Sequence, residues 1–377
     1  MQEKRGSQLL RLLDRYLGRL LLGILDGLLC VKRWVIHRQQ GEPRAHLVVC
    51  LGAIGDLVLL TEAVSSQLQG KRVFLACSRA NRTCAQMYRD VYAGIDVIEI
   101  RSLLDVHRIC KRRDIDVVFD STQWANIGPV QVGLARLFSR SLVTFGFKTK
   151  SWLRNAAYSH VVPHSNKLHE VANFINLLSG HASVLPGQQL APLLSAPFKK
   201  QAYRNTRKVL FHMWPSGARA YLKEWPEAYW IELARYFENL GYQIYLSGSP
   251  ADKPRNNAFI SRATNSTLVN IAGAYDLTEL SAFIHNEIEC VVSVNTGILH
   301  LVASLGVPLV GLHGPTNPVR WGPLGSNAVS LVPESGNFAY LNYGFEYPKE
   351  DAEAYALDQL SVAQVIGAVE QLKSRAS

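Results

Sequence analysis

A carboxylate ends a glycine-bounded turn near the start of the chain. Residues 46–51 are apolar and read as a strand, and Gly52-Ala53-Ile54-Gly55-Asp56 follows before a helical pattern begins. Glycines at 52 and 55 allow a tight strand-to-helix turn with close backbone approach. Asp56 has two interpretations: an acid that complements the helix dipole, which the spacing alone favours, or a general base at the ligand edge of a sheet.

A second set of polar residues lies in the stretch 289–325. A β-branched run at 291–294 precedes Asn295-Thr296-Gly297 and a helical pattern with His300 on its first turn, and the apolar run 307–312 precedes Gly314-Pro315-Thr316. In open α/β sheets ligands bind at the carboxyl ends of the strands, where helix N-termini suit phosphate. A plain strand–helix–strand unit with ordinary turn residues is the alternative.

A lysine stands before a predicted helix in the same half of the chain. Ser216-Gly217 follows the strand at 208–212, and Lys223 precedes Trp225-Pro226, with Pro226 at a plausible first helical position. A lysine at the ligand edge suits a diphosphate, whereas the commoner role of a single lysine is an exposed surface charge.

The elements that would position these residues alternate along the chain. Strand-like runs alternate with helical patterns, and a proline-containing stretch without clear period at 181–206 divides them into two series. The predicted fold is α/β, with two Rossmann-like, doubly wound parallel-sheet domains facing a central cleft. The predicted parts are a leucine-rich helix (1–40), an N-terminal domain (41–190), a C-terminal domain (207–335), and a tail whose helix packs back on the N-terminal domain (336–377).

Composition limits the partners. The 377 residues carry a net charge of +10, which indicates an anionic partner, and 48% hydrophobic with 19% charged residues describe a globular protein. Arg79 and Arg82 directly follow a predicted strand and are the better basic candidates for an anionic ligand.

Six cysteines form no C-x-x-C pair, which favours reduced thiols. The chain has no uncharged apolar run of 18 residues, so no membrane span is expected.

Residues 1–38 form a segment of their own. Leucines cover most of a predicted helix, and one stripe of it carries charged residues, namely Arg11, Arg15, Arg19, Asp26 and Arg33. Such a helix suits the headgroup layer of a membrane. Packing on its own domain or on a second subunit is the alternative.

Three separated motifs together resemble glycosyltransferase family 9, the ADP-heptose:lipopolysaccharide heptosyltransferases of GT-B fold. They are L-G-A-I-G-D-L-V-L-L-T-E-A at 51–63, L-K-E-W-P-E-A-Y-W at 222–230, and S-V-N-T-G-I-L-H-L-V-A-S-L-G-V-P-L-V-G-L-H-G-P-T at 293–316. The resemblance implies an inverting glycosyltransferase without catalytic metal or cofactor, with a nucleotide-diphosphate sugar, ADP-heptose, as donor. It also implies a lipid-linked, anionic glycan as acceptor. The enzyme would lie in the bacterial cytoplasm, bound peripherally to the cytoplasmic face of the inner membrane.

The resemblance also assigns roles to individual residues. It makes Asp56 the general base, in an acceptor-binding turn with Gly52, Ala53 and Gly55, to which we add Arg79 and Arg82. The donor-binding residues that it implies are Ser216, Gly217, Lys223, Leu277, Asn295, Thr296, Gly297, His300, Gly314, Pro315 and Thr316. Among these, Lys223, Ser216 and Gly217 hold the diphosphate and Leu277 touches the base.

Two departures from the family pattern leave alternatives open. Asn295 stands where heptosyltransferases often have Asp, and residues 213–216 differ from the usual H-P-G-x loop. The alternatives are a GT-B transferase or epimerase that uses another nucleotide sugar, and a catalytically inactive membrane-associated scaffold. A nucleic-acid binder is disfavoured because the sequence has no aromatic-basic RNP motif and no zinc module.

Overall fold

The computed structural model describes residues 8–33, 43–89, 95–123, 125–184, 205–216, 220–263, 267–325, 327–333 and 357–376. The chain divides near residue 190 into two compact units, here called unit 1 and unit 2. Residues 185–204, which are most of the linker predicted at 181–206, and residues 334–356 lie outside the described residues.

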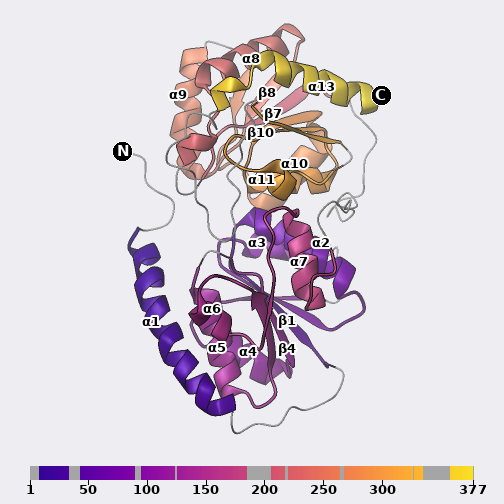
Figure 1. Ribbon diagram of the computed structural model, residues 1–377. Coiled ribbons are helices and arrows are strands. Elements are labelled where there is room, and N and C mark those ends of the chain that lie inside the picture. Colours follow the sequence, from indigo (N-terminus) through magenta and orange to yellow (C-terminus); the bar gives the residue numbers. More distant parts are fainter. Residues whose placement is uncertain are drawn as a thin grey trace. The chain divides into compact units, whose positions relative to one another are not determined.

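Unit 1 is built on a six-stranded, fully parallel sheet with the strand order β3-β2-β1-β4-β5-β6 (Figure 1). Its strands are short, and β1 is completely buried because the sheet is covered on both faces. The strands are β1 (His46–Cys50), β2 (Val73–Cys77), β3 (Ile95–Glu99), β4 (Val117–Asp120), β5 (Val143–Phe147) and β6 (His160–Val162).

Helices in two groups pack around this sheet. The first group contains helices that contact one another next to β1 and β2, namely α2 (Ile54–Gln67), α3 (Arg82–Arg89) and α7 (Glu170–Ser179). The second group packs around α5 and consists of α1 (Gln8–Arg33), α4 (Asp105–Arg113), α5 (Ile127–Phe138) and α6 (Trp152–Ala156).

The N-terminal helix α1 is an integral part of unit 1. Leu22, Leu25 and Leu29 recur at helical spacing and are buried, and α1 packs on α5 and α6. Asp14 accepts hydrogen bonds from the N–H groups of Asn126 and Ile127 at the start of α5. The alternative interpretation, that this helix packs on its own domain, is thus confirmed for one of its faces, and contact with a membrane stays a prediction. Among the described helices, none is long and apolar enough to cross a membrane.

The other end of α5 is held by the same helix. Lys32 Nζ donates to the carbonyl oxygen of Leu137 at 2.9 Å and also bonds to those of Arg136 and Ser139. A carboxylate at the start of a helix and an ammonium at its end both complement the helix dipole. Asp14 and Lys32 therefore clasp α5 at both ends.

Unit 2 repeats the topology of unit 1. Its sheet is also fully parallel, in the order β12-β11-β10-β7-β8-β9. Read from the β9 edge, this is the order of unit 1 with each strand number raised by six. The strands are β7 (Lys208–His212), β8 (Gln243–Leu246), β9 (Leu268–Asn270), β10 (Cys290–Val294), β11 (Leu309–Leu312) and β12 (Ala328–Leu331). The prediction of two doubly wound parallel sheets is confirmed.

The helices of unit 2 connect these strands. The α-helices are α8 (Glu227–Asn239), α9 (Lys253–Ala263), α10 (Leu277–Glu287), α11 (Gly297–Leu305), α12 (Pro318–Trp321) and α13 (Val362–Ala376). Short 3-10 turns are η1 (Ala220–Lys223), η2 (Pro250–Asp252) and η4 (Leu357–Gln359). Pro226 is the residue before α8, not its first helical residue.

The C-terminal helix corrects one prediction. We predicted that it packs back on the N-terminal domain, but Val365, Val369 and Leu372 of α13 belong to the apolar core of unit 2. They lie against α8, β11 and β12 (Figure 1). Trp225 Nε1 also donates to the carbonyl oxygen of Leu360 at 2.8 Å, just before α13 begins. Unit 2 leaves an apolar surface beside α8, and α13 buries it.

Candidate functional site

The turn after β1 places Asp56 in the first turn of α2, as predicted. Its Oδ2 accepts a hydrogen bond from the N–H of Ala53 at 2.8 Å, so the carboxylate satisfies one of the donors at the helix start. A Cβ atom on Gly52 would lie 2.5 Å from this Oδ2, which explains the glycine. Asp56 remains half-buried at the carboxyl end of β1. The helix-start role is therefore confirmed, and the role of general base stays a prediction.

A buried asparagine supports this turn from β2. Asn81 is 1% exposed, and its Nδ2 donates to the carbonyl oxygens of Cys50 at 3.1 Å and Gly52 at 3.2 Å. Ser78 Oγ donates to Asn81 Oδ1 at 3.0 Å, which fixes the side-chain amide. The sequence analysis did not single out Asn81, although a polar residue shortly after a buried strand was the available signal.

A second missed cluster lies at the end of β4, the neighbour of β1. Asp120 is fully buried, and its carboxylate accepts from Tyr158 Oη at 2.7 Å and from the N–H of Thr122 at 2.9 Å. Burial raises the pKa of Asp120 in spite of these hydrogen bonds. Ser121 Oγ donates to the carbonyl oxygen of Val49 at 2.8 Å. The strand order reverses between β1 and β4, which is where such sheets bind ligands.

The two arginines predicted for an anionic ligand follow β2 at the same edge of the sheet. Arg79 is exposed. Arg82 pairs with Glu99 at 2.9 Å, and Glu99 also pairs with Arg101 at 3.1 Å. Part of the charge of Arg82 is therefore neutralised within unit 1. Acceptor binding by either arginine stays a prediction.

In unit 2 the loop after β7 is held by α9. The guanidinium of Arg255 makes two bonds to the Glu224 carboxylate, at 2.9 and 2.6 Å, and lies 3.5 Å from the centre of the Trp214 ring. Trp214 Nε1 donates to Asn256 Oδ1 at 2.6 Å. A bidentate ion pair and a stacked ring fix the loop firmly, because the planar guanidinium holds both partners.

This loop brings Lys223 to Ser216. Lys223 Nζ lies 3.4 Å from the carbonyl oxygen of Ser216, and burial lowers the pKa of Lys223 to about 8. An ammonium that has lost part of its hydration gains when an anion binds beside it. Ser216 and Lys223 thus lie together as predicted, whereas Gly217 lies outside the described residues.

The loops after β10 and β11 are joined by a polar contact. Asn295 Nδ2 donates to Thr316 Oγ1 at 2.7 Å and lies 3.2 Å from His313 Nδ1. Burial lowers the pKa of His313 to about 3, so the imidazole is neutral. The sequence analysis named Asn295 and Thr316 but not His313. Gly314 and Pro315 are buried in the same loop.

Helix α11 begins between these loops. Thr296 is the residue before the helix, and Gly297 is its first residue. Among the described residues none bonds to Thr296 Oγ1, although this atom is buried. His300 in the first turn is 3% exposed, and its ring centre lies 6.5 Å from that of Trp321. The N–H groups of this helix start therefore lie beside a hydroxyl at the carboxyl end of β10, an arrangement that suits phosphate.

The carboxyl ends of β7, β10 and β11 are adjacent in the sheet. The structure thus brings most of the predicted donor-binding residues to one edge of unit 2. Leu277 is partly exposed and begins α10, after the outermost strand β9. Strand β8 lies between β9 and β7 in the sheet.

Comparisons with known proteins match this architecture. The family model described as glycosyltransferase family 9 (heptosyltransferase) matches residues 133–343, a stretch that contains Lys223, Thr296 and His300 but not Asp56. Lipooligosaccharide heptosyltransferase 2 of Haemophilus influenzae is 29% identical over 163 residues, 42% of this chain and 46% of that protein. Lipopolysaccharide heptosyltransferase 1 of Pseudomonas aeruginosa is 36% identical over 110 residues, 29% of this chain and 30% of that protein. The matched stretches thus span less than half the length of these curated relatives.

Solved structures share the fold over nearly the whole chain. The ADP-heptose lipopolysaccharide heptosyltransferase II of Escherichia coli superposes with a TM-score of 0.65 at 18% identity, covering 88% of this chain and 99% of that one. A family 9 glycosyltransferase of Veillonella parvula gives a TM-score of 0.63 at 19% identity, covering 88% and 97%. At these identities the likeness establishes the GT-B fold, with its two Rossmann-like domains. Because the family model matches more than half of its residues, the chain belongs to glycosyltransferase family 9.

Proposed function

We propose that this protein is an inverting, metal-independent glycosyltransferase that moves heptose from ADP-heptose to a lipopolysaccharide core or a related cell-envelope glycan. The observation that carries the proposal is the edge of unit 2 at which Lys223 contacts Ser216 while α11 begins next to Asn295 and Thr316. A helix start, a hydroxyl and a desolvated lysine together suit the diphosphate of a nucleotide sugar.

The proposed reaction has two requirements, and each unit supplies one. The acceptor hydroxyl attacks the anomeric carbon of the donor, Asp56 takes its proton, and the bond between that carbon and the diphosphate oxygen breaks. The departing nucleoside diphosphate carries the negative charge, which Lys223 and the N–H groups at the start of α11 stabilise. His300 contacts the diphosphate and donor sugar, Gly314 and Pro315 close the pocket, and Leu277 touches the base.

The acceptor side of the proposal rests on charge and on α1. A net charge of +10 and the arginines Arg79 and Arg82 suit an acceptor rich in phosphate and carboxylate. Residues 1–38 would keep the enzyme on the cytoplasmic face of the inner membrane, where a lipid-linked acceptor is available. The curated relatives named above are lipooligosaccharide and lipopolysaccharide heptosyltransferases, which supports this class of acceptor.

Calorimetric titration with ADP, UDP and GDP in the presence of EDTA tests the donor side. We expect ADP to bind at least tenfold more tightly than UDP or GDP, and ADP-heptose to support transfer with inversion at the anomeric carbon. A preference for UDP or GDP would mean that the donor is a UDP-sugar or a GDP-sugar and not ADP-heptose. Turnover of a nucleotide sugar without acceptor would identify an epimerase, and binding of none of the three would favour a scaffold.

One observation favours a second donor. Asn295 offers an amide where the family often has a carboxylate, and its Nδ2 is already engaged by Thr316. Only its carbonyl oxygen would then face a sugar hydroxyl, with a weaker hydrogen bond than a carboxylate would make. Parallel transfer assays with ADP-heptose and other ADP-hexoses would separate the two donors.

A further inference from the structure

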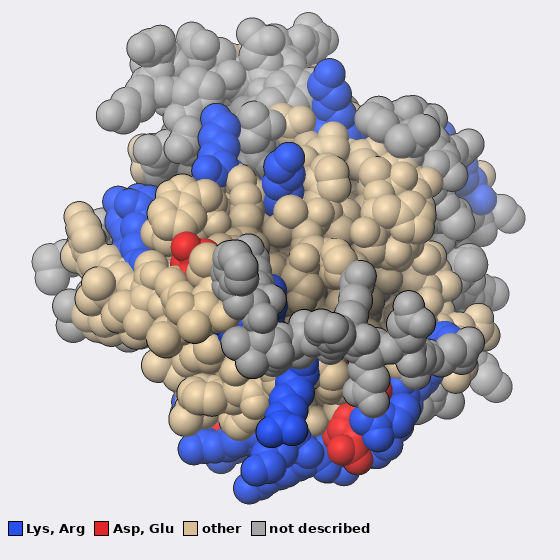
Figure 2. Space-filling view, turned by 60° about the horizontal axis from the view of Figure 1, so that its bottom comes forward, with Lys and Arg blue, Asp and Glu red and all other residues tan. Residues whose placement is uncertain are grey.

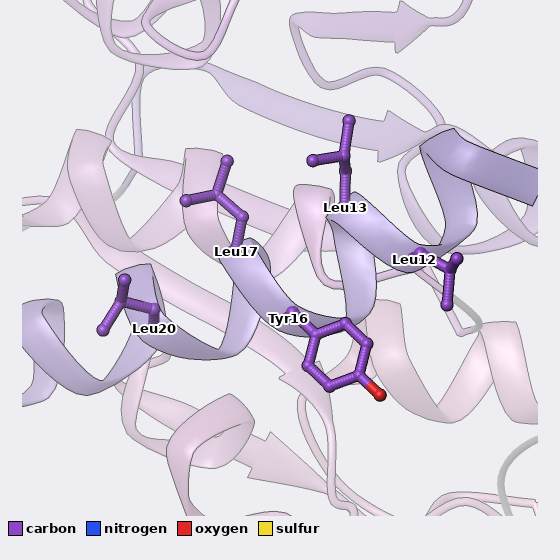
Figure 3. Close-up of a pocket in the computed structure, with 5 residues that line it drawn as sticks. All are labelled: Leu12, Leu13, Tyr16, Leu17 and Leu20. Atoms are coloured by element: carbon purple, nitrogen blue, oxygen red, sulfur yellow. The ribbon is translucent and has the colours of Figure 1, made fainter.

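Helix α1 has a second apolar face that unit 1 does not bury. Eight large apolar side chains along it are each between 45 and 69% exposed: Leu12, Leu13, Tyr16, Leu17, Leu20, Ile24, Leu28 and Val31. At 100° per residue they gather on the side opposite the buried leucines of the same helix. Five of them line a shallow depression on the surface of α1 (Figure 3).

We infer that this second face of α1 is the surface by which the protein binds an anionic lipid bilayer. The inference rests on the membrane location in the proposed function and deepens it, because it names the contact face. The sequence indicated a leucine-rich helix with a charged stripe, and the structure shows which of its apolar side chains remain exposed.

Basic side chains beside the apolar face favour an anionic bilayer as its partner. Arg15 and Arg19 are exposed and lie along one border of the apolar face, next to Tyr16 and Leu20. Against anionic headgroups each arginine would be attracted while the leucines enter the acyl boundary.

Exposed aromatic side chains also occur on the two helices that pack against α1. Trp152, the first residue of α6, is 65% exposed, and Phe138, the last residue of α5, is 58% exposed. Lys148, Lys150 and Arg140 close to them in sequence are exposed as well. Exposed aromatic rings with basic side chains nearby are typical of proteins that settle at the interface between lipid and water. Figure 2 shows that Lys and Arg also predominate over acidic residues at the lower end of the face that it presents.

The clasp on α5 makes this a rigid contact. Since Asp14 and Lys32 fix α1 to both ends of α5, the apolar face keeps a constant orientation relative to unit 1. The end of α1 that carries Asp14 lies at the start of α5, just after β4. A bilayer on this face would therefore lie alongside the sheet, and the carboxyl edge with Asp56 would stay accessible to an acceptor held in the membrane.

Flotation of the full chain with lipid vesicles tests the inference. Vesicles of phosphatidylethanolamine with phosphatidylglycerol are compared with vesicles of phosphatidylcholine alone. Leu17→Glu and Ile24→Glu each place a charge on the apolar face, and Leu240→Glu is the matched control because Leu240 is 42% exposed in unit 2. We expect each α1 variant to bind anionic vesicles about tenfold more weakly or worse, and the control to bind as the wild type does.

A variant without the two arginines tests the contribution of charge to vesicle binding. Arg15→Ala/Arg19→Ala should weaken binding to anionic vesicles by about fivefold per arginine and leave binding to phosphatidylcholine unchanged. Unchanged flotation of Leu17→Glu and Ile24→Glu would overturn the inference. So would a wild type that ignores vesicles but forms a dimer that Leu17→Glu dissociates, because the face would then join two copies.

An assay of sugar transfer to a delipidated, water-soluble acceptor tests the proposed function without requiring membrane binding. The α1 variants should retain that transfer together with the melting temperature of the wild type, because only the contact with lipid is lost. If the wild type itself transfers no sugar from any donor, the proposed function fails, and the flotation results still decide the role of α1.

Discussion

Asn295 and Thr316 are 21 residues apart, and their side chains are joined by a 2.7 Å hydrogen bond from Nδ2 to Oγ1. The bond connects the loop after β10 to the loop after β11, and both loops begin at the edge where α11 starts. Since the amide is buried, the bond also satisfies a polar group that could not turn to water. The two loops are therefore positioned by each other.

Removing this bond should loosen both loops. Thr316→Val keeps the shape of the side chain but leaves the buried amide one acceptor short, which should cost about 1–2 kcal/mol of unfolding free energy. Urea denaturation and ADP titration should both show a loss. Thr316→Ser retains the hydroxyl and serves as the control, expected to be near the wild type in both measurements. Equal stability of the valine and serine variants would mean that the bond contributes nothing.

The proposed base can be separated from the helix-start role of Asp56. Asp56→Asn keeps an oxygen that can accept from the Ala53 N–H but cannot take a proton from the acceptor hydroxyl. We expect kcat to fall by about 10²–10⁴ while the Kd for ADP stays unchanged. Asp105→Asn, which removes an acid from the start of another helix of unit 1, should leave kcat as it is. Turnover retained in Asp56→Asn would leave Asp56 a structural role only.

Nucleotide affinity should depend on pH through Lys223. The pKa of this lysine is about 8 without ligand, and a diphosphate favours the charged form. The affinity for ADP should therefore be full below pH 8 and decline above it, by up to about tenfold per pH unit. Lys223→Arg should flatten the profile because the guanidinium stays charged, and Lys223→Ala should weaken binding at every pH.

The control for Lys223 is a basic residue on the surface of unit 2 for which no role in ligand binding is predicted. Arg235 is exposed on α8, so Arg235→Ala should preserve both the ADP affinity and its decline above pH 8. If Lys223→Ala binds ADP as tightly as the wild type, the lysine does not belong to the diphosphate site.

Acid should weaken unit 1 through Asp105. Burial alone would raise the pKa of Asp105, but hydrogen bonds from Ser102 Oγ, from the N–H groups of Arg101 and Ser102, and from Arg108 lower it to about 2. A depressed pKa stabilises the fold above the unfolded value near 4, and this stabilisation is lost as the pH falls toward 2. Asp105→Asn should cost about 1–2 kcal/mol at pH 7, after allowance for solvent screening.

That difference should shrink between pH 4 and pH 2, where the wild-type carboxyl is protonated as well. Denaturation by urea at several pH values measures it. Asp96→Asn replaces an exposed acid on β3 of the same unit and should change the stability little at any of them. A gap between Asp105→Asn and the wild type that does not vary with pH would rule out the carboxylate charge as its cause.

Strands in the middle of both sheets could be predicted because they are buried on both faces and read as continuous apolar runs. The run at 208–212 coincides with β7, and that at 291–294 lies within β10. The edge strands β6 and β12 were missed, since three or four partly exposed residues give no such run. For α13 the periodicity showed that one face is apolar, but a periodicity does not name the partner, and the helix was assigned to the wrong domain.

The site was predicted where local sequence carries it and missed where tertiary contacts create it. Asp56, Thr296 and Lys223 stand next to strand ends or helix starts, so their place at the ligand edge followed from the β-α alternation. Asn81 and His313 act through side-chain bonds to residues far along the chain, which depend on strand order and register. No spacing in the sequence could reveal those bonds.

The clasp of α1 on α5 has a practical consequence for preparing this protein. An apolar N-terminal helix invites truncation to improve solubility. Such a truncation would uncover the surface of α5 and α6 that Leu22, Leu25 and Leu29 now cover, and would strip both ends of α5 of their partners. The shortened protein should then precipitate more readily than the full chain, so point substitutions on the outward face are the safer route to a well-behaved sample.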